Sequence, residues 1–236
     1  MLAYLRSLFG FRKVDPLLVA NGKYFARFDQ SLPLAKCSFV VFDTELTGLN
    51  RRKDEIVAIG AVKIANLRII LDETFYSYVR PENLEPRQST LVHRLTPEQL
   101  RQAPGLATVL PEFVRFIDQS LLVGHFVGID MAFLNRSVQE VLGGPLSNPC
   151  IDTMRMARGY KEARLVHGYG NSEQAQSYRL EDLASEFKLP RFKPHDALED
   201  ALQAAYLFLY LLQKLQRGGV STLKELYGAG RSAWLH

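Results

Sequence analysis

The sequence predicts an α/β protein with a mixed β-sheet, from three observations. A short, continuous apolar run at residues 39–42 is typical of a strand that is buried on both faces. Residues 56–64 and 67–79 have the pattern of two further strands joined by the tight turn Ala65-Asn66, which indicates an antiparallel pair. Beyond these strands, helical and strand patterns alternate, as they do in α/β domains.

The remaining elements are predicted from their end signals and apolar spacing. Thr96-Pro97 marks a helix start, with threonine as the N-cap and proline at the first helical position. Gly143 and Gly218 are positioned to end two longer helices. We expect helices at residues 107–119, 130–142, 178–187 and 195–216, a strand at 121–123, and an exposed polar loop at 167–179.

Composition is that of a globular protein with one large domain. The 236 residues are 47% hydrophobic and 23% charged, which is enough apolar side chain for a sizeable core. The net charge of +4 is compatible with a phosphate-bearing partner, but many proteins without one share it. We predict a domain at residues 37–216, an N-terminal extension at 1–36 that is helical, and a short tail at 217–236.

Nothing in the sequence predicts a membrane span or a secreted protein. No stretch approaches the roughly 18–20 apolar residues that a membrane helix needs, and the first apolar run is too short for a signal peptide. Cys37 and Cys150 lack metal-ligand spacing, so reduced thiols and a cytoplasmic location are expected. In the extension, apolar residues at helical spacing either pack on the domain or dock on a partner or a membrane surface: Leu2, Leu5, Leu8 and Phe9.

Two carboxylates follow the first predicted strand. The side chains of Asp43 and Glu45, at positions i and i+2 of a strand, project to the same side. An acid that directly follows a buried strand is costly unless it is paired or binds a metal. The competing interpretation is a solvated strand end.

Two later segments also carry acids at structural boundaries. Asp130 opens a predicted helix, and taken alone it is better explained as a cap of the helix N-terminus. Asp200 lies beside the apolar face of the last long helix, and it can share a site with His195 only if His195 lies at or before the first turn. Asp196 is the competing partner, since it is four residues from Asp200, and spacing does not choose between them. Asp196 and Glu199 are also suited to interact with the helix dipole.

Three stretches together resemble the motifs of one enzyme family, in order. They are FVVFDTELTGL (39–49), GHFVGIDMAFL (124–134) and HDALEDA (195–201), with supporting segments at 93–98 and 150–153. They resemble the DEDDh branch of the DEDD exonucleases, which includes the proofreading epsilon subunit of bacterial DNA polymerase III, across residues 37–215. The resemblance implies a ribonuclease-H-like fold, a mixed five-stranded sheet flanked by helices, and hydrolytic removal of 3′-terminal nucleotides.

The resemblance also implies roles for individual residues. Asp43, Glu45, Asp130 and Asp200 would bind two Mg²⁺ or Mn²⁺ ions, whose preference for oxygen ligands fits carboxylates. His195 would be the general base, because an imidazole titrates near neutrality. On this basis Asp196 is left as an acid at the helix start.

Residues that would contact substrate are assigned by the same match: Thr44, Leu46, Thr47, His93, His125 and Phe126. The chain departs from the family pattern at three of the motif positions. Leu46 stands where many relatives have threonine, and Phe126 and Ile129 stand where the middle motif usually has asparagine and phenylalanine. Phe126 could offer a base-stacking face, or it could be a core aromatic beneath the helix.

The function expected from these observations is a 3′→5′ exonuclease that acts on DNA ends, with single strands as the preferred form and nucleoside 5′-monophosphates as products. Trimming of RNA or short oligonucleotides is an alternative, since nothing in the motifs reports on the 2′-hydroxyl. A non-catalytic module that binds nucleic acid or a polymerase is the alternative outside enzymes. The oligomeric state and any partner of residues 1–36 stay open.

Overall fold

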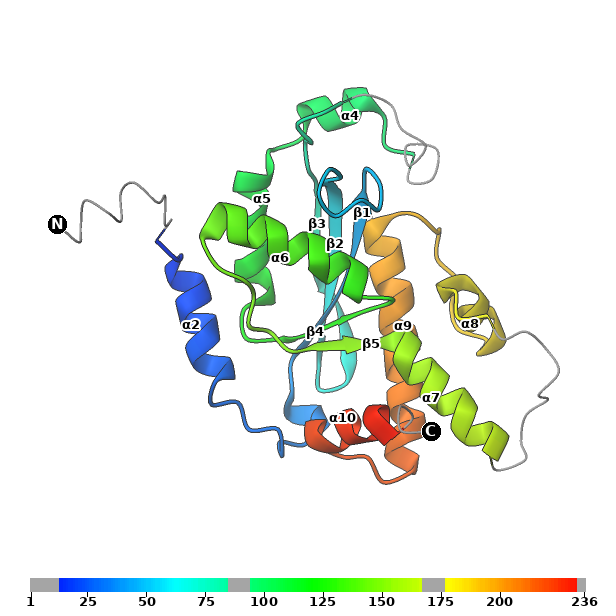
Figure 1. Ribbon diagram of the computed structural model, residues 1–236. Helices are drawn as coiled ribbons and strands as arrows, with labels where there is room; N and C mark the ends of the chain where they lie inside the picture. Colours follow the sequence, from blue (N-terminus) through cyan, green and yellow to red (C-terminus); the bar gives the residue numbers. More distant parts are fainter. Residues whose placement is uncertain (1–12, 85–93, 167–176, 233–236) are drawn as a thin grey trace.

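The computed structural model describes residues 13–84, 94–166 and 177–232, and it is built around one five-stranded sheet (Figure 1). The strands lie in the order β3-β2-β1-β4-β5. The first three pair antiparallel, whereas β4 and β5 run parallel to β1, so the predicted mixed sheet is confirmed. The strands are β1 (Phe39–Leu46), β2 (Ile56–Ala65), β3 (Arg68–Tyr78), β4 (Leu121–Gly124) and β5 (Cys150–Asp152).

Helices cover both faces of this sheet and one of its ends (Figure 1). Within the described ranges they are α2 (Pro16–Phe25), the short 3₁₀ helix η1 (Leu34–Lys36), α4 (Pro97–Gln102), α5 (Leu106–Ile117), α6 (Gly128–Leu142), α7 (Thr153–Val166), α8 (Leu180–Glu186), α9 (Ala197–Arg217) and α10 (Leu223–Ser232). None of them is long and apolar enough to cross a membrane.

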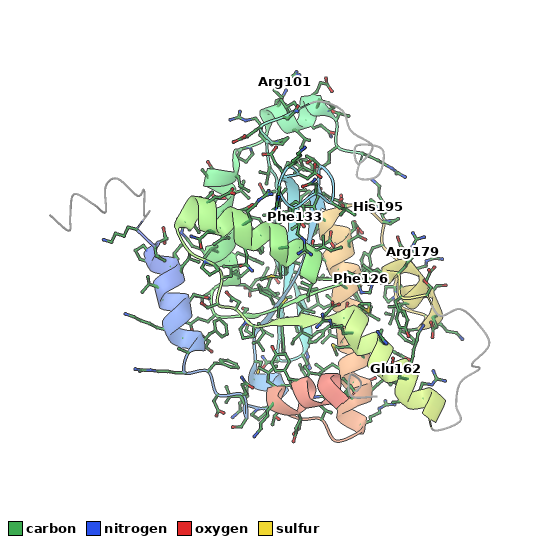
Figure 2. All side chains as sticks on the ribbon, in the orientation of Figure 1. Arg101, Phe126, Phe133, Glu162, Arg179 and His195 are labelled. Carbon is green, nitrogen blue, oxygen red and sulfur yellow. The ribbon has the colours of Figure 1, made fainter. Side chains whose placement is uncertain are left out.

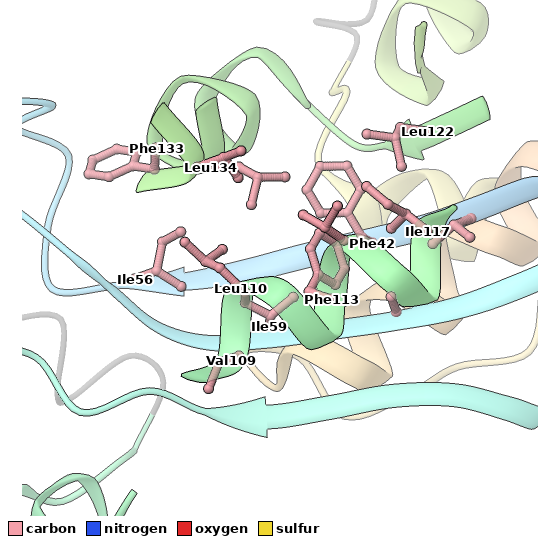
Figure 3. Close-up of a cluster of buried hydrophobic side chains, with 14 of the residues drawn as sticks. Phe42, Ile56, Ile59, Val109, Leu110, Phe113, Ile117, Leu122, Phe133 and Leu134 are labelled. Carbon is pink, nitrogen blue, oxygen red and sulfur yellow. The ribbon is translucent and has the colours of Figure 1, made fainter. Parts of the chain in front are cut away.

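Alternation along β1 divides the core into two layers. Val40 and Phe42 face α5 and α6, where Phe42 lies 6.0 Å from Phe113 between ring centroids (Figure 3). Phe39 and Val41 face α9 on the other side of the sheet. Because strand side chains alternate with period two, the positions that follow Val41 on the α9 face are those of the two acids.

The first strand extends further than its apolar run predicts. Asp43 and Glu45 are paired with Gly60 and Ala58 of β2, so both acids lie within the strand instead of beyond its end. Strand pairing continues through them because β2 is long enough to supply backbone partners. The sheet therefore carries two charged side chains directly onto the face that α9 covers.

Several helix boundaries differ from the sequence expectation. Helix α6 begins at Gly128, two residues early, and α9 begins at Ala197 because the Asp196 side chain caps it. Thr96 forms the expected cap: its hydroxyl accepts from the Gln99 backbone N–H, and its own backbone N–H donates to the Gln99 side chain. Strand β5 and helices α7 and α10 were not predicted as elements, since their patterns are short or poor in apolar residues.

The described part of the N-terminal extension packs on the domain. The Asp15 side chain caps α2, and its backbone N–H donates to the Leu142 carbonyl at 2.8 Å. Leu18 is buried in the core, and Asn21 donates to the Asp118 carbonyl at 2.8 Å. The helical prediction for residues 2–9 lies outside the described residues. Cys37 and Cys150 are both free thiols.

Candidate active site

Three carboxylates meet where β1 passes beneath the start of α9. Asp43, Glu45 and Asp200 each offer one oxygen, and these oxygens all lie within 4.8 Å of one another. The first two come from adjacent same-face positions of β1, and Asp200 comes from the first turn of α9. The expectation that Asp200 joins the strand acids is therefore realised in the fold.

Gly60 explains how α9 comes so close to the strand. It is the register partner of Asp43. A Cβ atom at this position would lie 2.2 Å from the Ala197 carbonyl carbon and 2.2 Å from the Leu198 nitrogen. Only glycine leaves room for the helix backbone there, as glycines inside strands often do where another backbone approaches. The glycine within the apolar run IVAIGAV was the available sequence signal, and it was missed.

Asp130 approaches the cluster from the α6 side of the sheet. It is buried, and its Oδ1 accepts from the Thr44 backbone N–H at 3.1 Å and from the Thr44 hydroxyl at 2.5 Å. It is not the N-cap of α6, because that position is Val127. Asp130 thus stands apart from the group of three, although its charge is the strongest repulsion that Asp43 experiences.

Burial raises the pKa of all four acids, and repulsion from neighbouring carboxylates adds to the effect. Burial is the first cause for Asp43, whose pKa lies well above its ordinary value, with repulsion from Asp130 next. Burial followed by Asp200 raises the pKa of Glu45 to about 7. Burial brings the pKa of Asp130 and that of Asp200 to about 6. Within the described part of the chain no lysine or arginine forms a salt bridge with these acids. The cluster consequently favours the entry of cations.

His195 lies at the exposed rim of the cluster, just before α9 (Figure 2). Its φ is +64°, and its backbone N–H donates to Asp200 Oδ2 at 2.8 Å. Asp196 caps the helix by accepting from the backbones of Leu198 and Glu199. His195 therefore satisfies the condition for sharing a site with Asp200, and Asp196 acts at the helix start as expected.

Tyr76 supports this helix start from β3. Its hydroxyl donates to Asp196 Oδ2 at 3.2 Å. Burial and the neighbouring Tyr78 raise the pKa of Tyr76, so the hydroxyl stays protonated and keeps donating. Sequence reasoning missed this contact because nothing local links β3 to the last long helix.

His125 is held by protein groups at both ring nitrogens. Nδ1 lies 2.8 Å from the Thr153 hydroxyl, and Nε2 lies 2.8 Å from the Tyr178 carbonyl. A carbonyl only accepts, so Nε2 carries the proton. Burial lowers the pKa of His125, which keeps the ring neutral. This histidine links the start of α7 to the segment that leads into α8.

Phe126 points outward, so the alternative of a core aromatic is wrong. Its side chain is 42% exposed, and nearby Ile129 is 38% exposed. The backbone at Phe126 has φ +52°, and its N–H donates to Asp152 Oδ1 at 3.1 Å. The ring meets His125 edge-on, with centroids 4.9 Å apart. Phe126 and Ile129 therefore expose apolar surface in the segment that leads directly into Asp130.

The other residues assigned to substrate occupy varied positions. Thr44 is buried and engaged by Asp130, and Leu46 packs partly against the α5/α6 core. The Thr47 hydroxyl donates to Asp54 Oδ1 at 3.2 Å. His93 lies outside the described residues. Of this set, Phe126 presents the most open face.

The comparison with known families agrees with this geometry. A family model described as exonuclease matches residues 40–208. The chain belongs to this exonuclease family. The match includes all of β1 after its first residue, the start of α6 and the first half of α9, which carry the four acids. The expectation of a hydrolytic enzyme is confirmed at the level of the family.

Relatives of this exonuclease domain include proteins named after DNA polymerase III. The DNA polymerase III subunit epsilon-like protein of Rhodobacter capsulatus is 37% identical over 193 residues, which cover 80% of this chain and 26% of that protein. The DNA polymerase III PolC-type of Thermotoga maritima is 32% identical over 225 residues, covering 95% and 15%. The chain thus spans about a quarter or less of the curated relatives it matches.

Solved structures of exonuclease I share the fold. One of them has a TM-score of 0.65 and 19% identity, covering 75% of this chain and 41% of that chain. E. coli exonuclease I in complex with a dT13 oligonucleotide has a TM-score of 0.65 and 18% identity, covering 77% and 42%. The ribonuclease-H-like fold is therefore confirmed, and the family match confirms the resemblance to this group of exonucleases.

Proposed function

We propose that this exonuclease domain removes nucleotides one at a time from the 3′ ends of single-stranded DNA and releases nucleoside 5′-monophosphates. The observation that carries the proposal is the group of three carboxylates, Asp43, Glu45 and Asp200, at the start of α9. Support for DNA comes from the polymerase names of the relatives and from the oligonucleotide complex of exonuclease I.

The acids fit divalent cations of the Mg²⁺ or Mn²⁺ kind. Four oxygen donors are available, and hard cations prefer such ligands. Burial, followed by repulsion between carboxylates, raises the pKa of Asp43 and Glu45, and bound cations would favour their charged forms. Asp43, Glu45, Asp130 and Asp200 are the proposed ligands, with Asp130 held ready by Thr44. When bound, two such cations activate the attacking water and neutralise the leaving 3′ oxygen.

His195 is proposed as the general base, which places the chain in the DEDDh branch. Its ring lies at the exposed rim, where an attacking water can reach it, and its backbone N–H is fixed on Asp200. A neutral imidazole there can accept the proton from that water. Asp196 and Tyr76 keep the histidine at this position by fixing the first turn of α9.

Phe126 is proposed to stack against a base near the 3′ end. Such contacts contribute about 1–3 kcal/mol per base in single-strand binders and tolerate every sequence. His125 contacts the Phe126 ring edge-on. Because hydrogen bonds at both nitrogens fix the His125 ring, this contact holds Phe126 in place. Thr44 acts through Asp130, whereas Leu46, Thr47 and His93 stay predictions from the family match.

Degradation of 3′- and 5′-labelled single-stranded DNA and RNA oligonucleotides in Mn²⁺ or Mg²⁺ tests the proposal. The wild type should shorten DNA from the 3′ end, and Asp43→Asn should abolish the ladder. Asp72→Asn is the matched control, because Asp72 is an exposed acid of β3 on the same sheet. Preference for RNA would favour the trimming alternative. Absence of cleavage with either metal would favour a non-catalytic nucleic-acid-binding module.

A further inference from the structure

We infer that the basic loop, residues 50–53, binds backbone phosphates of the substrate strand upstream of its 3′ end. The loop has the sequence NRRK and joins β1 to β2. This inference rests on the proposed function, and it assigns to the exonuclease a second contact that makes binding depend on strand length.

The loop is held in one shape by the buried acid Asp54. Its Oδ2 accepts from the Asn50 backbone N–H at 2.8 Å, and its own N–H donates back to the Asn50 carbonyl at 2.9 Å. The Asn50 side chain accepts from the Arg52 N–H at 3.0 Å. Gly48 permits this packing, since a Cβ there would lie 2.4 Å from Asp54 Oδ2. The turn is therefore ordered before any ligand arrives.

Arg136 of α6 fastens the loop to the body of the domain. Its guanidinium donates to the carbonyls of Arg51 and Asp54, the second at 2.6 Å, and it lies over the Phe133 ring. Arg136 is half-buried, and through these two hydrogen bonds it holds a segment that carries three positive charges. Because the loop is already ordered, little conformational entropy is lost when it binds a ligand.

The three cations themselves are available to a ligand. Arg51, Arg52 and Lys53 are exposed, and none of their side chains forms a salt bridge with another described residue. Three adjacent cations without counter-charges leave a concentrated positive surface on the loop. Consecutive, regularly spaced negative charges on a nucleic-acid backbone are the complementary partner.

The position of the loop fits a phosphate contact close to the acids. It starts a few residues after Glu45 and lies at the same end of the sheet as the beginning of α9 (Figure 1). The four carboxylates repel an incoming strand, and the loop provides a compensating positive charge at the rim. A strand whose 3′ end lies on the acids thus passes within reach of the long side chains of Arg51, Arg52 and Lys53.

The test compares wild type with the triple variant Arg51→Gln, Arg52→Gln, Lys53→Gln. Binding of a labelled 15-nucleotide DNA strand is followed by fluorescence anisotropy in EDTA, so that turnover does not interfere. Each phosphate contact to a single strand contributes about −0.7 to the slope of log affinity against log salt. Three contacts predict that wild-type affinity falls about 20-fold more than that of the variant between 50 and 200 mM salt.

The matched control removes three exposed cations from the α2/α5 side: Lys23→Gln, Arg27→Gln, Arg115→Gln. This variant has the same net charge as the loop variant and should keep the wild-type salt slope. Equal slopes for the wild type and the loop variant overturn the inference, and so does an equal change in both triple variants. If the loop variant unfolds at a lower temperature, single substitutions should each reduce the slope by about 0.7.

Turnover separates this inference from the proposed function. With Mn²⁺, wild type should shorten a long strand rapidly and slow once the strand no longer reaches the loop, whereas the loop variant should lose this dependence on length. Absence of any degradation by wild type refutes the proposed function and leaves the anisotropy result to decide the inference. Degradation with no dependence on length in wild type counts against the loop alone.

Discussion

Gly60→Ala is expected to separate the two halves of the active site without unfolding the protein. Gly60 is the β2 partner of Asp43, and the backbone of α9 lies directly on it. The added methyl group would lie 2.2 Å from the backbone atoms of Ala197 and Leu198, whereas ordinary contacts begin at 3.4 Å. The start of α9 therefore has to retreat by roughly 1 Å, and Asp200 and His195 move with it.

This movement of α9 is expected to reduce kcat more strongly than it reduces the free energy of unfolding. A misplacement of about 1 Å at catalytic groups can reduce kcat by about 100-fold. Overpacking of a well-filled core costs about 1–3 kcal/mol in the free energy of unfolding, which corresponds to a fall in Tm of several degrees for a domain of this size. Metal affinity should fall too, because Asp200 no longer meets Asp43 and Glu45.

Three measurements on one preparation check this reasoning: kcat on a single-stranded oligonucleotide, Mn²⁺ binding by calorimetry, and thermal unfolding. Gly105→Ala is the matched control, because a Cβ at Gly105 meets nothing within 4 Å. We expect it to keep both kcat and Mn²⁺ affinity. A Gly60→Ala protein with kcat within twofold of wild type would falsify the argument that this glycine positions α9.

The remaining predictions concern charge and support. In EDTA, Tm should fall as pH rises from about 4 to 7, because the folded acids with raised pKa bind more protons than the unfolded chain. Asp43→Asn should therefore raise Tm at pH 8 and lose this advantage at pH 5. A Tm difference between variant and wild type that is the same at both pH values refutes the repulsion. Tyr76→Phe removes a bond to Asp196 of about 1 kcal/mol, so kcat should fall severalfold with KM nearly constant, as steady-state kinetics will test. Arg136→Met should lower Tm by a few degrees in calorimetry, because two loop carbonyls lose their donor.

The chemistry of the site was largely present in the sequence. Asp43 and Glu45 follow a buried strand at same-face spacing, so local alternation alone indicated that both carboxylates face one point. The start of α9 was also placed within two residues, because proline and acidic residues mark helix N-termini. Spacing left Asp196 and His195 unresolved as partners of Asp200, and the family motif resolved them.

Tertiary structure decided which of these groups meet and how. Asp130, in the first turn of α6, accepts from Thr44 of β1, and Phe126 points into solvent instead of into the core. Such outcomes depend on strand register and on the close approach of α9 to Gly60, which join segments far apart in the chain. Local patterns determine which face a side chain occupies, but only the packing of distant backbones fixes the distance between two charges.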